Sequence, residues 1–224
     1  MQFLYACTKE SGVEKTLNCG SLSLQVIMTL CGPYCLAVVA EEGNDCEGAA
    51  QIIDETVRDV TEWFYKEAVP LLCQNKSAVS VKRSFFRIII APKEKKIERN
   101  VLNFTVLLLG KKVYYLFCFG KGYCYKIGKK VEFLTSINGY GNRRCKYFGE
   151  HSFLYKKGRY SKADVFLLCD RNFVGYLEGK SFLVFQHEKK MTERKLQRLM
   201  QEIIARAETK GVKQNCTAII LKRN

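Results

Sequence analysis

This sequence of 224 residues has only three prolines, two histidines and one tryptophan. It has no apolar run of transmembrane length. Met1–Glu10 lacks the basic segment and apolar stretch of an export signal. No second cysteine or histidine pair accompanies Cys31 and Cys35, so we expect no zinc site. The eleven cysteines lie largely in apolar segments, which is typical of a reducing cell. We therefore expect a cytoplasmic protein without membrane insertion, built as one domain over residues 1–224.

Acidic residues are scarce in the second part of the chain. Residues 1–75 contain 4 Lys/Arg and 11 Asp/Glu, so the totals of 37 and 22 leave 33 basic and 11 acidic residues for 76–224. This excess favours anionic partners such as nucleic acid, phosphorylated protein or anionic lipid. The candidates for such a contact are Arg143, Arg144, Lys146, Lys156, Lys157, Arg159 and Lys162. A solvated basic surface explains them equally well, because no nucleic-acid-binding motif accompanies them.

Apolar periodicity predicts both strands and helices. The expected strands are Phe3–Cys7, Leu22–Thr29, Cys35–Ala40, Phe104–Leu109, Val113–Phe119, Tyr123–Ile127, Val131–Leu134, Val165–Cys169 and Thr217–Leu221. The expected helices run from Asp45 to about Leu72, over Ser80–Ala91 and from Thr192 to about Lys210, although Phe85–Ile90 could equally be a strand. Glycine-bearing gaps, Gly120-Lys121-Gly122 among them, predict that the four strands within 104–134 are antiparallel neighbours, and Ser136–Arg159 is expected to be an excursion. The fold class predicted is α+β, with antiparallel sheets covered by helices.

The buried strand Val165–Cys169 leads directly into Asp170 and Arg171. A carboxylate at the end of a buried strand is a common position for a metal ligand or catalytic acid, because the scaffold is rigid and the dielectric is low. It is also a common N-cap for a following helix, and this stretch taken alone favours the cap.

The order of these pieces along the chain resembles that of the metal-dependent type-2C protein serine/threonine phosphatases. The matching segments are Lys15–Gly20, Val38–Glu42, Val113–Ile127, Glu132–Thr135, Asp164–Asp170 and the end of the chain, where a helix, Gly211 and Gln214–Ile220 follow one another. The resemblance covers nearly the whole chain and implies a four-layer α/β/β/α sandwich, with two antiparallel sheets flanked by helices.

Members of that family hold two divalent ions, usually Mn or Mg, with a set of aspartates, and a basic residue near the first strand receives the phosphate. The positions that the resemblance implies for these roles are Lys15, Gly20, Glu41, Glu42, Asp170, Arg171 and Gln214. Gly20 has no coordinating side chain, Gln214 is neutral, and Asp170 alone is an unchanged aspartate. Hard divalent ions need several charged oxygens, so we expect no cofactor and no catalysis, with Glu41 and Asp170 as the ligands of any metal that does bind.

We expect a catalytically inactive domain that acts as a regulatory or protein-interaction module. Arg171 or Lys121 is predicted to take the place of the missing metals through a salt bridge to Asp170. Alternatively, Lys15, Lys121 and Arg171 form an anion pocket that binds a phosphorylated protein without hydrolysing it. Two further functions remain open: a weak or atypical phosphatase that uses Mn or Mg, and anion or nucleic-acid binding through the basic face.

Overall fold

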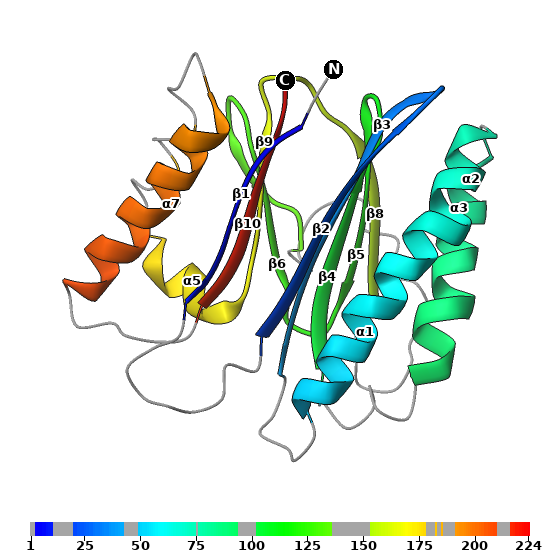
Figure 1. Ribbon diagram of the computed structural model, residues 1–224, viewed down its shortest axis with the longest axis horizontal. Helices are drawn as coiled ribbons and strands as arrows, with labels where there is room; N and C mark the ends of the chain where they lie inside the picture. Colours follow the sequence, from blue (N-terminus) through cyan, green and yellow to red (C-terminus); the bar gives the residue numbers. More distant parts are fainter. Residues whose placement is uncertain are drawn as a thin grey trace.

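Two antiparallel sheets of five strands each lie face to face (Figure 1). The computed structural model describes residues 3–10, 20–42, 49–74, 76–93, 102–135, 153–177, 191–209 and 216–224, together with 182 and 185. The first sheet contains, in spatial order, β1 (Phe3–Glu10), β10 (Cys216–Arg223), β9 (Val165–Cys169), β6 (Tyr123–Ile127) and β7 (Val131–Phe133). The second contains β2 (Gly20–Thr29), β3 (Gly32–Glu42), β4 (Leu102–Leu109), β5 (Val113–Phe119) and β8 (Phe153–Arg159).

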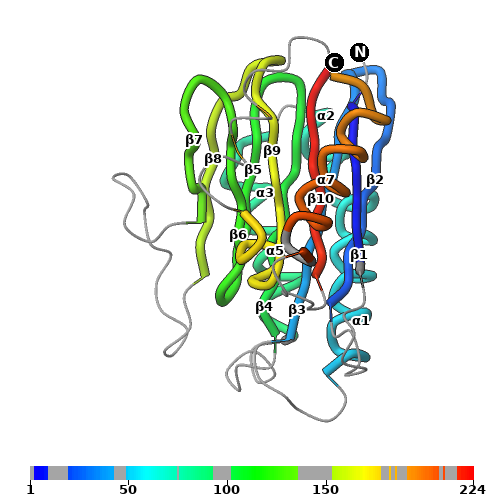
Figure 2. Tube along the Cα trace, turned by 90° about the vertical axis from the view of Figure 1, so that its left-hand side faces the viewer, coloured from blue at the N-terminus to red at the C-terminus, as the bar shows by residue number. Residues whose placement is uncertain are grey.

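Helices cover the outer face of each sheet, which confirms the predicted four-layer α/β/β/α sandwich (Figures 1 and 2). The first sheet is covered by α5 (Arg171–Tyr176) and α7 (Glu193–Glu208). The second is covered by α1 (Ala49–Trp63), η1 (Phe64–Ala68), α2 (Val69–Cys73), α3 (Ala78–Phe85), η2 (Phe86–Ile90) and η3 (Ala91–Lys93). Within the described part of the chain, no helix combines the length and apolar character needed to cross a membrane.

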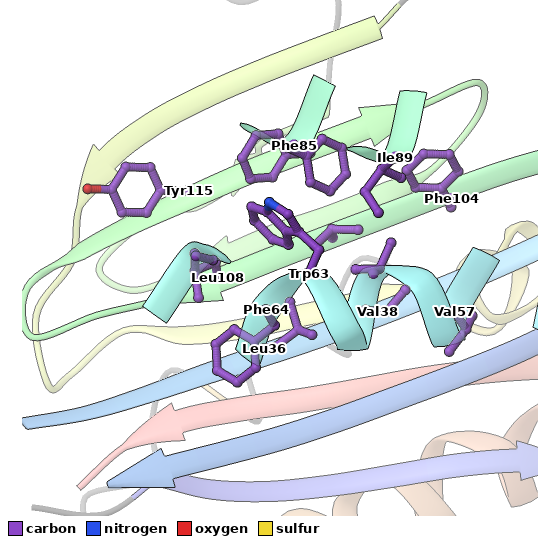
Figure 3. Close-up of a cluster of buried hydrophobic side chains, with 14 of the residues drawn as sticks. Leu36, Val38, Val57, Trp63, Phe64, Phe85, Ile89, Phe104, Leu108 and Tyr115 are labelled. Carbon is purple, nitrogen blue, oxygen red and sulfur yellow. The ribbon is translucent and has the colours of Figure 1, made fainter. Parts of the chain in front are cut away.

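Three apolar clusters hold the four layers together, one between the sheets and one beneath each helical layer. The strand β9 is buried along its whole length, as its continuous apolar run predicts. Trp63 lies at the centre of the cluster beneath α1 and α3 (Figure 3). Its ring meets Phe85 edge-on at a centroid distance of 4.8 Å, and its indole N–H donates to Ser84 Oγ at 3.0 Å. The single tryptophan therefore fixes α1 against α3 through both packing and a buried hydrogen bond.

The helix predicted to end near Leu72 runs from Ala49 to Cys73 through a wider turn at η1. In that turn the Val69 N–H donates to the Phe64 carbonyl five residues back. Pro70 follows immediately and has no N–H to continue the regular ladder, which accounts for the irregular turn beside it. Asp45, expected to begin this helix, lies outside the described residues. The ambiguous run Phe85–Ile90 is helical, with Ser77 capping α3 by accepting the Ser80 N–H.

The expectation that the four strands within 104–134 are consecutive antiparallel neighbours is wrong at Gly120-Lys121-Gly122. There the chain leaves β5, which pairs with β4 and β8, and enters β6 in the other sheet, where it pairs with β7 and β9. Gly120 has a φ of +68°, and a Cβ at either glycine would overlap a β4 side chain, Asn103 at Gly120 and Thr105 at Gly122. The glycines therefore allow the backbone to cross closely over β4 rather than form a hairpin.

The expected excursion over Ser136–Arg159 also needs correction, because Phe153–Arg159 forms β8 at the edge of the second sheet. Its alternating sequence exposes Lys157 and Arg159. Exposed cations are typical of an edge strand, where they discourage pairing with another chain.

Candidate functional site

The candidate functional site lies at one end of the sandwich, where β3 and β9 terminate between the two sheets. The β2–β3 register places Gly20 opposite Glu41, and the β3–β4 register places Asn103 on the other side of Glu41. Asp170 follows the last residue of β9 in the facing sheet. The topology thus brings together three positions that lie far apart in the sequence: Gly20, Glu41 and Asp170.

Asp170 is the N-cap of α5. Its Oδ1 accepts the Phe173 N–H at 2.8 Å, and its own N–H donates to the Thr217 carbonyl on β10 at 3.0 Å. The residue is 5% exposed. Burial raises the pKa of the Asp170 carboxyl to about 6, although hydrogen bonds from Phe173 and Thr217 oppose that rise. The capping role that the local sequence favours is therefore confirmed.

Glu41 connects the two sheets. Its Oε2 accepts the backbone N–H of Arg171 at 3.1 Å, so a side chain from the end of β3 reaches the first residue of α5. Burial raises the pKa of Glu41 to about 7; the hydrogen bond from Arg171 opposes the rise, and the nearby charge of Asp170 adds to it. The guanidinium of Arg171 lowers this pKa by a smaller amount. The charge of Asp170 therefore raises the pKa of Glu41, and the nearby guanidinium of Arg171 does not offset the effect of burial.

Asp170 does not form the expected salt bridge with Arg171 or with Lys121. Asp170, Arg171 and Lys121 all belong to the described part of the chain. Both cationic side chains are exposed. The Lys121 N–H donates to Asn103 Oδ1 at 2.9 Å, which anchors the crossing between the sheets. Backbone N–H groups, rather than a cation, satisfy the carboxylates because both lie at the start of α5, where such donors are unpaired.

Several polar side chains around Glu41 come from β4, β5 and β6, and sequence reasoning did not identify them. Thr105 Oγ1 donates to Cys118 Sγ at 3.6 Å, and the charge of Glu41 adds to the burial that raises the pKa values of Cys118 and Tyr123. Asn103 could have been noticed as an amide near the beginning of an otherwise apolar strand. Its importance depends on the strand register, which the sequence alone does not specify.

The described residues do not fit a centre for two divalent ions. Gly20 offers no side chain, and the carboxylates of Glu41 and Asp170 already accept backbone N–H groups. Over the described ranges, no group of three or more His, Cys, Asp or Glu side chains could hold a metal ion. Glu42, the next residue of β3, points to the opposite side of the strand from Glu41. Lys15 and Gln214, two further positions implied by the resemblance, lie outside the described residues.

Comparison with solved structures identifies protein phosphatases over the full length of the chain. The serine/threonine phosphatase of S. agalactiae matches with a TM-score of 0.71 and 12% identity, covering 100% of both chains. The Mycobacterium tuberculosis serine/threonine phosphatase PstP/Ppp matches with a TM-score of 0.68 and 12% identity, covering 98% of both chains. PppA, described as a regulatory component of the T6SS in Pseudomonas aeruginosa, matches with a TM-score of 0.67 and 14% identity, covering 99% of this chain and 98% of its own.

No protein-family profile matches the sequence, and no curated protein matches it. The chain therefore has the fold of the type-2C serine/threonine phosphatases at very low sequence identity. At such identity the fold is shared, and the chemistry has to be argued from the residues at the site.

Proposed function

We propose that this chain is a catalytically inactive phosphatase-like domain that serves as a regulatory or protein-interaction module. The observation that carries the proposal is the state of the two remaining carboxylates. Asp170 caps α5, and Glu41 accepts the N–H of Arg171. Both carboxyl groups thus accept hydrogen bonds from backbone N–H groups, and burial raises the pKa of each.

The electrostatic balance also supports the absence of two-metal chemistry. A pair of dications needs several anionic oxygens to offset the loss of its hydration shell, and the described residues supply two carboxylates. The nearby guanidinium of Arg171 lowers the pKa of Glu41, so the charge that it adds near the site is positive, whereas a metal ion needs further negative charge. Instead, Glu41 accepts the Arg171 N–H and links β3 of the second sheet to α5, while Asp170 caps α5.

The proposal is tested by measuring turnover of a phosphopeptide and a generic aryl phosphate in the presence of Mn²⁺. We expect the same rate for the purified protein and for its Asp170→Ala variant. The matched control is Asp54→Ala, which removes an exposed carboxylate from α1, away from the site. Mn²⁺-dependent turnover that Asp170→Ala abolishes and Asp54→Ala retains would contradict the proposal.

That contradicting outcome would identify the second candidate function, an atypical phosphatase that uses a single metal ion. One observation favours it: Glu41 and Asp170 lie close enough for the charge of one to raise the pKa of the other. A dication between them would relieve this repulsion. It would also have to displace the N–H groups of Arg171 and Phe173, which is why the inactive domain is the stronger proposal.

A further inference from the structure

Four turns between strands lie at the end of the sandwich opposite to the candidate functional site. They connect β2 to β3, β4 to β5, β6 to β7 and β8 to β9. Figures 1 and 2 show them at the same end as the two chain termini, whereas the end of β3 and the start of α5 lie at the other end. Because adjacent strands are antiparallel, these turns together form a surface separate from Glu41 and Asp170.

Contacts between the turns make this surface continuous across both sheets. The stem of Lys111, after β4, covers the turn after β2: a Cβ at Gly32 would lie 2.9 Å from Lys111 Cε. The Tyr160 N–H, after β8, donates to the Lys112 carbonyl at 3.1 Å. The fold therefore fixes the β4–β5 turn, with Lys111 and Lys112, relative to the β2–β3 and β8–β9 turns.

Exposed lysines dominate these turns, and we call the five of them together with Leu30 the lysine-turn surface. The five are Lys111, Lys112, Lys129, Lys130 and Lys162. The one acidic residue in the four turns is Asp164, whose carboxylate accepts the Ser161 N–H at 2.7 Å and packs against Gly128. None of the five lysines forms an ion pair with another described residue. Their positive charge therefore faces solvent, and Asp164 is the one negative charge within these turns.

The end of the β2–β3 hairpin exposes apolar side chains near these lysines. Leu22 and Leu24 of β2 pack between the sheets, and alternate residues further along the strand continue the same face. Toward the turn this face is no longer covered, so Met28 is 65% exposed and Leu30 is 108% exposed. Leu30 is a fully exposed leucine in the same turn as Gly32, which Lys111 covers, and it takes no part in the core of the described residues.

We propose that the lysine-turn surface binds an anionic lipid bilayer, with the lysines against the headgroups and Leu30 and Met28 at the acyl boundary. An anionic bilayer complements both features, because it presents negative charge above an apolar layer. A nucleic acid complements the lysines alone: it has no apolar layer for Leu30. The aromatic stacking side chains that favour single strands are missing from the described part of this surface. The proposal is independent of whether the site at Glu41 and Asp170 has any activity.

The test is sedimentation of the full chain with vesicles of phosphatidylcholine alone and of phosphatidylcholine with about one-third phosphatidylserine. We expect binding to the anionic vesicles that weakens with salt, and little binding to the neutral ones. Each lysine near an anionic surface contributes about fivefold in partitioning, so Lys111→Gln combined with Lys130→Gln should lower it about 25-fold. Leu30→Ser should lower it about tenfold by removing the apolar contact.

The matched control combines Arg58→Gln and Arg206→Gln, which make the same change in net charge on the exposed faces of α1 and α7. It should retain wild-type partitioning, and all variants should keep the wild-type Tm because every altered residue is exposed. Equal losses in the control would mean that net charge alone drives binding, which overturns the proposal. An unaffected Leu30→Ser variant, or displacement from vesicles by a short DNA duplex at equal phosphate concentration, would overturn it in favour of a general polyanion site.

Discussion

Replacing Glu41 by glutamine should stabilise the protein at neutral and alkaline pH. The pKa of Glu41 rises from 4.5 to about 7 on folding because the carboxyl group is buried near Asp170. Below the unfolded pKa both states hold the proton, so the carboxyl contributes no pH dependence. Between about pH 4.5 and 7 the unfolded chain releases a proton that the folded chain keeps, so the free energy of unfolding falls as the pH rises.

The size of this effect follows from the shift. At 1.36 kcal/mol for each pKa unit, the charged Glu41 costs the folded state about 3 kcal/mol at about pH 8. Glutamine keeps an oxygen that can accept the Arg171 N–H and never ionises. Glu41→Gln should therefore raise the free energy of unfolding by about 3 kcal/mol at about pH 8 and change it little at about pH 4.

Urea unfolding at a series of pH values, with a chelator present, measures this directly. Thr192→Ala is the control, because it removes the N-cap that accepts the Lys195 N–H and alters no titrating group. It should lower the free energy of unfolding by about 1 kcal/mol at every pH. Destabilisation by Glu41→Gln at about pH 8 would instead mean that a cation such as Arg171 balances the charge of the carboxylate.

Two further variants test the packing around the fold. Ser84→Ala removes the acceptor of the buried Trp63 N–H and should lower the free energy of unfolding by about 1–3 kcal/mol, measured by urea unfolding. Gly122→Ala should cost a similar amount, about 1–3 kcal/mol, because its Cβ would overlap Thr105 Oγ1. Adding Thr105→Ala should recover part of that loss in a double-mutant cycle, and strictly additive losses would show that the two residues do not interact.

Local sequence patterns predicted most elements of the fold because each carries its own periodicity. The helical spacing that predicts a helix to about Leu72 and the continuous apolar run Val165–Cys169 depend on burial of their own residues, and the structure confirms both. The crossing at Gly120–Gly122 could not be predicted in this way. A glycine-bearing gap between two strands is the same signal whether the chain turns back or enters the facing sheet, and distant pairing decides between them.

The candidate site was predictable in its main residues and unpredictable in its bonding. Asp170 follows a buried strand and Glu41 precedes a long helix, and the resemblance to the phosphatases placed both at one site. The hydrogen bond from Arg171 to Glu41 joins residues that are 130 positions apart. The predicted salt bridge rested on side-chain charge and did not consider the unpaired N–H groups at the start of α5, which satisfy the carboxylates of Glu41 and Asp170 instead.

Calorimetric titration of Mn²⁺ into the full chain tests whether Glu41 and Asp170 belong to a metal centre, because it measures metal binding whether or not a substrate is known. We expect no stoichiometric binding at micromolar concentrations and the same weak heats for wild type and Asp170→Asn. Asparagine is used because it retains the capping oxygen of α5. One or two equivalents of tightly bound Mn²⁺ that disappear in Asp170→Asn would show that Asp170 is a ligand in a functional metal centre.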